Sequence, residues 1–223
     1  MAEALDRANL DPVNAAGANR DRALKVKLIL FDVDGVLTDG SIWLFPAPAA
    51  GPRSTDAHAQ QHADGPGFGI ISQNMIEAKG FNAHDGTAIS LAHLGGLKTG
   101  MATKRISETV ALRARDLKID FLYQGAHNKS DVLDKILAEG GYSEEQVAYV
   151  GDDVIDLPIM RRCGLAIAVA NARPQVKAMA HYETASRGGH GAARDAVEYI
   201  LQAQGSLDKA IESYIVGMRV NPK

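Results

Sequence analysis

Leu28 to Phe31 is a run of four apolar residues that ends abruptly at Asp32. Such a short continuous run is typical of a strand buried on both faces, as in a parallel sheet covered by helices. The turn after such a strand lies at the carboxyl edge of the sheet, where open α/β folds bind ligands. Asp34 follows within the same turn, and two adjacent carboxylates favour a divalent metal between them. The alternative is a polar loop whose aspartates only cap a turn.

Strand and helix patterns alternate along the rest of the chain. The predicted strands span residues 97–102, 120–123, 147–150 and 165–169, and the predicted helices span residues 85–94, 106–117, 131–139 and 192–203, with another helix after Pro174. Asp85 is predicted to cap the first of these helices. Because repeated βα units favour parallel strands with helices on both faces, we expect an α/β fold with a doubly wound, mostly parallel sheet.

A second, smaller feature is predicted beside this sheet. Residues 41–45 and 75–83 have extended character and are expected to pair as a projecting β-hairpin. Residues 46–69, rich in Pro, Gly and Ala, are predicted to form a loop insertion within that hairpin. No insertion large enough for a cap domain lies between Thr103 and Lys129.

Composition limits the class of protein. The 223 residues carry 24 basic and 27 acidic side chains, and this balance argues against a nucleic-acid or membrane-surface binder. The single cysteine, Cys163, excludes an intramolecular disulfide and fits a reducing compartment. Residues 1–23 lack the apolar core of a signal peptide and are predicted to be a flexible extension, so we expect a cytoplasmic protein.

Polar residues follow the predicted strands at the edge where ligands bind. They are Asp32, Asp34, Thr103, Lys129, Asp152, Asp153 and Asp156. Carboxylates with one lysine and one hydroxyl suit phosphoryl transfer, since a metal and a lysine neutralise phosphate oxygens. An aspartate can then attack phosphorus, and a second carboxylic acid can protonate the leaving alcohol. Taken singly, each residue has a plainer interpretation, such as a helix cap at Thr103 or a solvated side chain at Lys129.

These residues resemble motifs of the haloacid dehalogenase superfamily of phosphohydrolases. The matching segments are Asp32-Val33-Asp34-Gly35-Val36-Leu37-Thr38, Thr103, Lys129 and Gly151-Asp152-Asp153-x-x-Asp156. Further segments resemble the 3-deoxy-D-manno-octulosonate 8-phosphate phosphatases, namely FNAHDG (81–86), FLYQG (121–125), VAYVGDDVIDLPIM (147–160) and RGGHGAARD (187–195). The resemblance covers about residues 25–212, and it implies a phosphatase domain over residues 24–205.

The resemblance also implies a role for each residue at the strand ends. The roles are nucleophile for Asp32, general acid/base for Asp34, phosphate binding for Thr103 and Lys129, Mg²⁺ binding for Asp32, the main-chain carbonyl of Asp34 and Asp152, and support for Asp153 and Asp156. It further implies a homotetramer without a large cap, in which the hairpins meet and a neighbour's C-terminal tail closes each site.

The chain departs from that family at two positions near the substrate. His84 stands where the family usually has arginine, and Lys104 stands where it usually has glycine, although Arg105 is kept. A histidine cannot bind a carboxylate bidentately as arginine does, and Lys104 would restore a cation nearby. Another sugar-acid phosphate, such as a nonulosonate 9-phosphate, or a broader range of sugar phosphates therefore stays open as the substrate.

Two further alternatives concern the class of protein and the tail. A phospho-receiver signalling module also has acidic residues, a threonine and a lysine, but its acidic pair lies on a separate strand from the phosphorylated aspartate. The tail, residues 206–223, has helical spacing of its apolar residues, which are Leu207, Ile211, Tyr214, Ile215 and Met218. That face would either extend its own core or, as the resemblance implies, approach a neighbouring active site.

Overall fold

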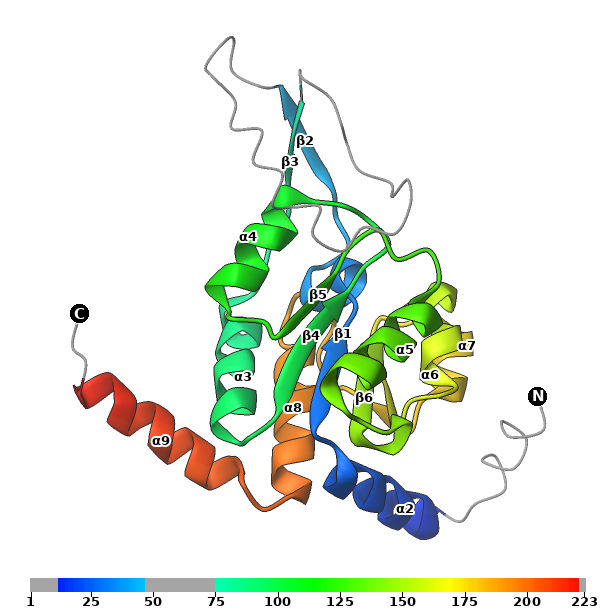
Figure 1. The fold of residues 1–223 in the computed structure, drawn as a ribbon, viewed down its shortest axis with the longest axis vertical. Helices are drawn as coiled ribbons and strands as arrows, with labels where there is room; N and C mark the ends of the chain where they lie inside the picture. Colours follow the sequence, from blue (N-terminus) through cyan, green and yellow to red (C-terminus); the bar gives the residue numbers. More distant parts are fainter. Residues whose placement is uncertain (1–11, 47–74, 221–223) are drawn as a thin grey trace.

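The structure, a computed structural model, describes residues 12–46 and 75–220 (Figure 1). Its strands are β1 (Leu28–Phe31), β2 (Trp43–Pro46), β3 (Met75–Ala78), β4 (Lys98–Ala102), β5 (Phe121–Tyr123), β6 (Val147–Gly151), β7 (Leu165–Ala168) and β8 (Tyr182–Glu183). Its helices are α2 (Pro12–Lys25), α3 (Ala83–Leu94), α4 (Glu108–Asp116), α5 (Lys129–Gly140), α6 (Leu157–Met160), α7 (Pro174–Met179), α8 (Ala192–Ala203) and α9 (Leu207–Val220). Short helical turns are η1 (Val33–Leu37), η3 (Glu144–Gln146) and η4 (Val154–Asp156). None of the helices in these ranges is both long and apolar enough to cross a membrane.

Six strands form one parallel sheet in the order β5-β4-β1-β6-β7-β8. β1 is central, and Leu28 pairs with Lys98 on one side and with Val147 on the other. All four side chains of β1 are fully buried, which explains why this strand is a continuous apolar run rather than an alternating one. The predicted doubly wound parallel sheet is confirmed.

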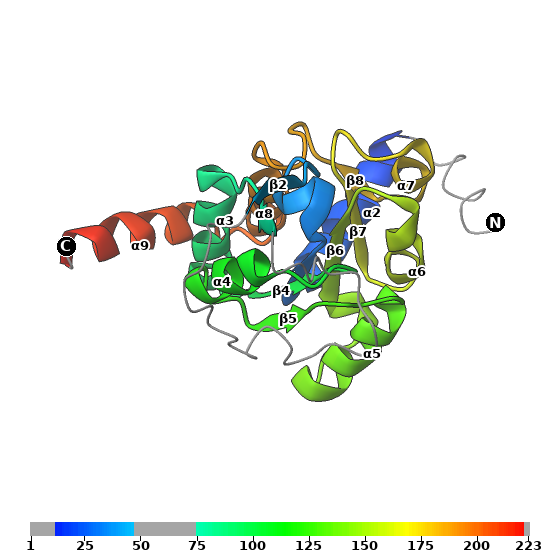
Figure 2. The same ribbon diagram turned by 90° about the horizontal axis from the view of Figure 1, so that it is seen from above.

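Helices cover both faces of this sheet. Seen from above, α3, α4 and α8 lie on one side, and α5, α6 and α7 lie on the other (Figure 2). The chain runs outward from β1 through β4 to β5, then returns to β6 on the other side of β1. The strand order therefore reverses between β1 and β6, and this switch point is where doubly wound sheets open a crevice for ligands. In the part of the chain that the structure describes, no cap domain covers it.

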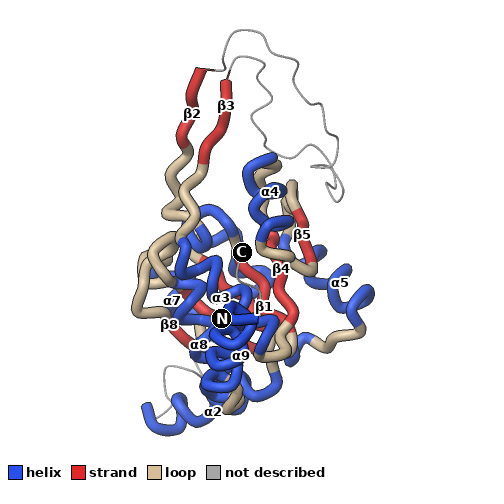
Figure 3. The backbone as a smooth tube through the Cα atoms, turned by 90° about the vertical axis from the view of Figure 1, so that its left-hand side faces the viewer, coloured by secondary structure: helices blue, strands red, loops and turns tan. Residues whose placement is uncertain are grey.

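The hairpin is a separate two-stranded antiparallel ribbon that projects beyond the sheet (Figure 3). Trp43 pairs with Ala78 at its foot, and Pro46 pairs with Met75 at the last described position. The hairpin is shorter than predicted, because β3 ends at Ala78 and α3 begins soon after it. Except for Pro46, the predicted insertion 46–69 lies outside the described residues.

The prediction of a flexible extension over residues 1–23 is wrong for its second half. Residues 12–25 form α2, and Ala23 is fully buried. Gln204 Nε2 donates to the carbonyl oxygens of Ala23 at 3.0 Å and Val26 at 2.8 Å, and Arg22 Nη1 donates to a loop carbonyl at 2.8 Å. Composition missed this helix because side-chain hydrogen bonds to distant carbonyls, rather than an apolar stripe, attach it. Residues 1–11 lie outside the described part.

The tail forms α9, whose first half packs on its own subunit. Ala210 is fully buried, and Leu207, Ile211 and Tyr214 pack against the core. α9 lies against α3 and α8, at the end of the molecule opposite the ribbon (Figure 1). The first half of the predicted apolar face therefore extends its own core. Ile215, further along the same face, stays exposed.

Candidate active site

The carboxyl ends of β1, β4 and β6 meet at the switch point of the sheet. Asp32 follows β1, Thr103 follows β4, and Asp152 follows β6. Lys129, the first residue of α5, brings its ammonium to the same edge, since Nζ lies 2.8 Å from Asp32 Oδ2. The structure therefore brings these four predicted residues together.

Asp32 is buried, and each of its carboxylate oxygens has a partner. Oδ1 accepts the backbone N–H of Val33 at 2.7 Å, while Oδ2 faces Lys129. Burial raises the pKa of Asp32 to about 7, and the nearby Asp156 carboxylate raises it as well, although Lys129 opposes both. Because only the carboxylate form is nucleophilic, a further cation at this edge would favour the reactive state.

Lys129 is held inside the protein by acceptors. Its Nζ lies 2.6 Å from Asp156 Oδ1 and 5.7 Å from the centre of the Tyr149 ring. The Tyr149 hydroxyl donates to the same Asp156 oxygen at 2.7 Å. Burial alone would lower the pKa of Lys129, but Asp32 and Asp156 together raise it above its ordinary value. Lys129 is therefore a fixed positive charge beside Asp32.

Asp156 acts as a support for its neighbours. Carboxylate oxygens of Asp32, Asp152 and Asp156 lie within 4.8 Å of one another. The Oδ2 atom of Asp156, however, accepts the backbone N–H groups of Asp152 at 2.9 Å and Asp153 at 3.2 Å, and Oδ1 is taken by the two donors already described. Asp153 is exposed, and its Oδ1 caps η4 by accepting the N–H of Val154 at 2.7 Å. Asp32 and Asp152 are left as the carboxylates that face each other.

The same two carboxylates form a donor set that fits Mg²⁺. Asp152 lies directly over Gly35, where a Cβ would come within 2.1 Å of Oδ2 and where φ is +87°. Burial, together with the charges of Asp32 and Asp156, raises the pKa of Asp152 to about 8. A hard divalent cation with oxygen ligands would relieve that repulsion, and the main-chain carbonyl of Asp34 belongs to the same turn.

Asp34 lies at the mouth of the site in η1, where it is half-buried. Its Oδ1 forms an ion pair with Lys79, and its Oδ2 lies 3.9 Å from Nε of Arg105. Arg105 also donates from Nη2 to Glu77 Oε2 at 2.7 Å. The hydroxyl oxygen of Thr103 is buried beside them and accepts the backbone N–H of Arg105 at 3.3 Å. Asp32 and Asp34, which follow β1, therefore pair with different lysines: Asp32 with Lys129 and Asp34 with Lys79.

The two positions that depart from the family are accessible. His84 is exposed in the first turn of α3, and Lys104 is half-buried in the turn that follows β4. Their role in substrate binding stays a prediction.

The turn η1 is held in place by Asn171 and the glycine loop 188–191. Asn171 Nδ2 donates to Gly35 O at 3.2 Å, and its Oδ1 accepts the N–H of Gly188 at 2.6 Å. Gly189 N–H donates to Val36 O at 2.9 Å. A Cβ on Gly188 would lie 1.8 Å from Gly35 O, so only glycine permits this contact. These glycines bring the loop against the backbone of the turn that carries Asp34.

Asp85 does not cap its own helix, which corrects the prediction. The N-cap of α3 is Asn82, whose side chain accepts the N–H of His84 at 2.8 Å. Asp85 is buried and accepts the N–H groups of Gly191 and Arg194, each at 3.1 Å. It therefore ties the start of α3 to the start of α8, next to the glycine loop.

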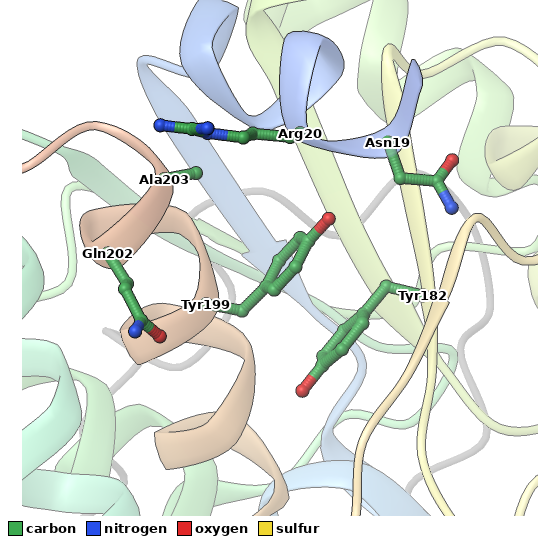
Figure 4. A pocket seen from close by; sticks show the side chains of 6 residues that line it. All are labelled: Asn19, Arg20, Tyr182, Tyr199, Gln202 and Ala203. Carbon is green, nitrogen blue, oxygen red and sulfur yellow. The ribbon is translucent and has the colours of Figure 1, made fainter. Parts of the chain in front are cut away.

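A hollow of about 590 Å³ lies away from this site. It is lined by Asn19, Arg20, Tyr182, Tyr199, Gln202 and Ala203 (Figure 4). The rings of Tyr182 and Tyr199 stack there with centroids 4.0 Å apart. The hollow adjoins α2 and the end of α8, at the edge of the sheet opposite Asp32, and it contributes nothing to the carboxylate site.

Comparison with known proteins identifies the family. Residues 99–194 match the haloacid dehalogenase-like hydrolases. The chain is 35% identical over 189 residues to the 3-deoxy-D-manno-octulosonate 8-phosphate phosphatase of Escherichia coli, covering 85% of this chain and 86% of that protein. The chain belongs to this phosphatase family.

Solved structures of the family share the fold. A 3-deoxy-D-manno-octulosonate 8-phosphate phosphatase from Yersinia pestis superimposes with a TM-score of 0.72 and 34% identity, covering 86% of this chain and 89% of that one. The enzyme from Moraxella catarrhalis, solved with magnesium, phosphate and KDO, gives a TM-score of 0.72 and 30% identity over 88% of this chain and 97% of that one. As a member of the family, the chain is a phosphatase.

Sequence reasoning missed several residues of this phosphatase site. Glu77 lies in β3 and Lys79 directly follows that strand. Their spacing of two predicts side chains on one face of an extended segment, but it does not predict their contact with Asp34 and Arg105. Asn171 follows β7 and could have been found by the strand-end argument. Nothing in the sequence marks Tyr149 as a site residue, because it resembles any other apolar residue of a buried strand.

The raised pKa values predict how stability depends on pH. In folded, metal-free protein Asp32 and Asp152 titrate at about 7 and about 8, against an ordinary value of 3.8. Between those limits the folded state holds protons that the unfolded state releases, so the free energy of unfolding should fall as pH rises from about 5.5 to about 8. Urea unfolding in EDTA measures this. Asp32→Asn should flatten the slope, and a free energy that rises with pH would contradict the burial argument.

Proposed function

We propose that this phosphatase hydrolyses 3-deoxy-D-manno-octulosonate 8-phosphate to the free sugar acid and phosphate, through a phosphorylated Asp32. The observation that carries the proposal is the buried contact of Asp32 with Lys129 at the switch point, next to Asp152. A fixed cation beside a buried carboxylate suits attack on a phosphate, because the lysine offsets the charge of the incoming group. The Escherichia coli relative supports the choice of substrate.

The chemistry would take place in two steps. A carboxylate oxygen of Asp32 attacks phosphorus, the bond from phosphorus to the sugar oxygen breaks, and Asp34 gives that oxygen a proton. Water then attacks the phosphorus of the aspartyl phosphate, Asp34 takes the proton of the water, and the bond to Asp32 breaks. Thr103 and Lys129 hold the phosphate oxygens throughout, while Asp156 keeps Lys129 in place.

Mg²⁺ would be held by Asp32, Asp152 and the main-chain carbonyl of Asp34, with Asp153 capping the adjacent turn. When bound, it supplies positive charge that offsets the phosphate and allows Asp32 to approach. The Moraxella catarrhalis structure, which contains magnesium, supports this choice of metal.

A substrate panel with and without metal tests the proposal. Phosphate release from 3-deoxy-D-manno-octulosonate 8-phosphate, a nonulosonate 9-phosphate and glucose 6-phosphate is measured with Mg²⁺ and after EDTA treatment. We expect the highest kcat/KM on the first substrate and a loss of at least about 100-fold in EDTA, reversed by added Mg²⁺. A preference for the nonulosonate 9-phosphate would make that compound the substrate, and it would agree with the departures from the family at His84 and Lys104. Full activity in EDTA would refute the metal.

We further propose that the chain forms a cytoplasmic homotetramer through its ribbon. The ribbon exposes Trp43, Leu44, Phe45 and Ile76, and an isolated two-stranded ribbon is marginally stable in water. Contact between ribbons of different subunits would cover these side chains. Ile215 and Val216, which are exposed beyond the part of α9 that packs on its own core, would lie near a neighbouring active site.

A further inference from the structure

Four charged side chains meet where the ribbon joins the sheet. Glu77 comes from β3 and Lys79 directly follows that strand, while Asp34 comes from η1 and Arg105 from the turn after β4. We call them the four-charge cluster. Asp34 is the only one that the proposed reaction uses directly as an acid and base, so the function of the other three needs an explanation.

Lys79 is buried to an extent that is unusual for a lysine. The exposed fraction of its side chain is 0%, and its ammonium contacts Asp34 Oδ1 and lies 3.6 Å from Glu77 Oε1. Burying an ammonium is costly unless acids surround it, and these two acids compensate for it. Lys79 therefore has no access to solvent and is fixed against one oxygen of Asp34.

Glu77 fixes both cations that flank Asp34. Its Oε2 accepts from Arg105 Nη2 at 2.7 Å, and its Oε1 faces Lys79. Arg105 Nε is buried 3.9 Å from Asp34 Oδ2, without a hydrogen bond to any of the described residues. Such buried polar groups are costly to stability, and sites under functional constraint retain them.

We infer that Lys79 is a positioning residue for Asp34, and that Glu77 holds Lys79 in turn. The inference rests on the proposed function, in which Asp34 protonates the leaving oxygen. A half-buried carboxyl group at the mouth of a site can rotate, and a charge-assisted hydrogen bond to one oxygen fixes it. The other oxygen is then directed to the leaving group, where small misplacements reduce rates strongly. The Lys79 ammonium pairs with Asp34 and Glu77, so phosphate binding at Lys129 should survive its loss.

Lys79→Met tests this with two leaving groups. An alkyl phosphate needs a proton on its leaving oxygen, whereas p-nitrophenyl phosphate releases a stable anion without one. We expect kcat/KM for the alkyl phosphate to fall by about 100-fold and that for p-nitrophenyl phosphate by less than about 3-fold. Because kcat/KM includes only steps up to departure of the alcohol, hydrolysis of the aspartyl phosphate does not affect it. Equal losses for both substrates would overturn the inference.

A double-mutant cycle shows whether Lys79 acts through Asp34. If it does, adding Lys79→Met to Asp34→Asn should lower kcat/KM for the alkyl phosphate by less than about 2-fold, although each single change is costly. Multiplicative losses would show an independent role and overturn the inference. Lys79→Arg should recover most of the activity, and Lys79→Gln replaces Lys79→Met if the methionine variant does not fold.

Two controls separate this inference from the proposed function. Lys98→Met removes another paired lysine, 2.6 Å from Asp120 at the opposite edge of the sheet, and should leave both substrates unaffected. Asp32→Asn tests the reaction itself. An active Asp32→Asn enzyme would refute the proposed function, whereas an inactive one combined with equal losses in Lys79→Met would refute the positioning role alone.

Discussion

Asp32→Asn should lower kcat by about four orders of magnitude, a loss on the scale of removing a covalent catalyst. The amide keeps the size of the side chain but is not a nucleophile, and it contributes no charge to the metal site. Lys129 would still be held by Asp156 in this variant, so the phosphate site should remain assembled. The measurement is steady-state release of phosphate from p-nitrophenyl phosphate at saturating Mg²⁺.

Stability separates this catalytic loss from a folding defect. Burial raises the pKa of Asp32 to about 7, so the ionised carboxylate destabilises the metal-free fold. The asparagine variant should therefore melt at or above the temperature of wild type in EDTA at pH 8. Asp208→Asn, on the exposed side of α9, is the matched control and should behave as wild type in both assays. Retention of about a tenth of the activity by Asp32→Asn would contradict the nucleophile assignment.

Lys129→Met should destabilise the fold as well as abolish turnover. Lys129 is 1% exposed and is the cation between Asp32 and Asp156. Removing one partner of a buried ion pair leaves the remaining charges uncompensated, which costs about 3–5 kcal/mol of unfolding free energy. Urea unfolding in EDTA at pH 8 measures the loss.

Lower pH should restore part of that stability. Asp32 and Asp152 already have raised pKa values, and loss of the ammonium raises that of Asp32 further, so both are protonated in the folded variant at about pH 5.5. The deficit relative to wild type should therefore shrink as pH falls from about 8 to about 5.5. Lys25→Met removes an exposed pair with Glu145 and should cost less than about 1 kcal/mol at either pH. Equal unfolding midpoints for Lys129→Met and wild type would contradict the buried-cation argument.

The parallel sheet and the polar residues at its edge were predictable because the patterns that indicate them are local in sequence. Each central strand is a short apolar run, and Asp32 and Asp152 follow β1 and β6 directly. The right-handed rule for parallel connections then places these residues at one edge without any knowledge of distances. Helix α8 was predicted at its observed bounds for the same reason, since its apolar spacing is regular.

The residues that were missed or misassigned depend on contacts between distant parts of the chain. Asp85 looks like an N-cap of its own helix but accepts hydrogen bonds from the start of α8. Lys79 pairs with Asp34 because the chain returns to the sheet after the ribbon, and no local sequence pattern indicates that these two residues meet. Helix α2 is attached by hydrogen bonds from Arg22 to the carbonyl of Gly164 and from the Gln204 side chain to the carbonyl of Val26, and composition does not reveal contacts between such distant residues.

The position of the ribbon links catalysis to protein abundance. Its strand β2 exposes Trp43 and Phe45, while Lys79 at its foot contacts Asp34. In the proposed homotetramer, contacts between ribbons would order this foot, and by mass action the fraction of chains with an ordered foot would grow with total concentration. Specific activity measured on serial dilution should therefore decline below the assembly midpoint, before the fold itself is lost. The output of the enzyme would then increase more steeply than its amount.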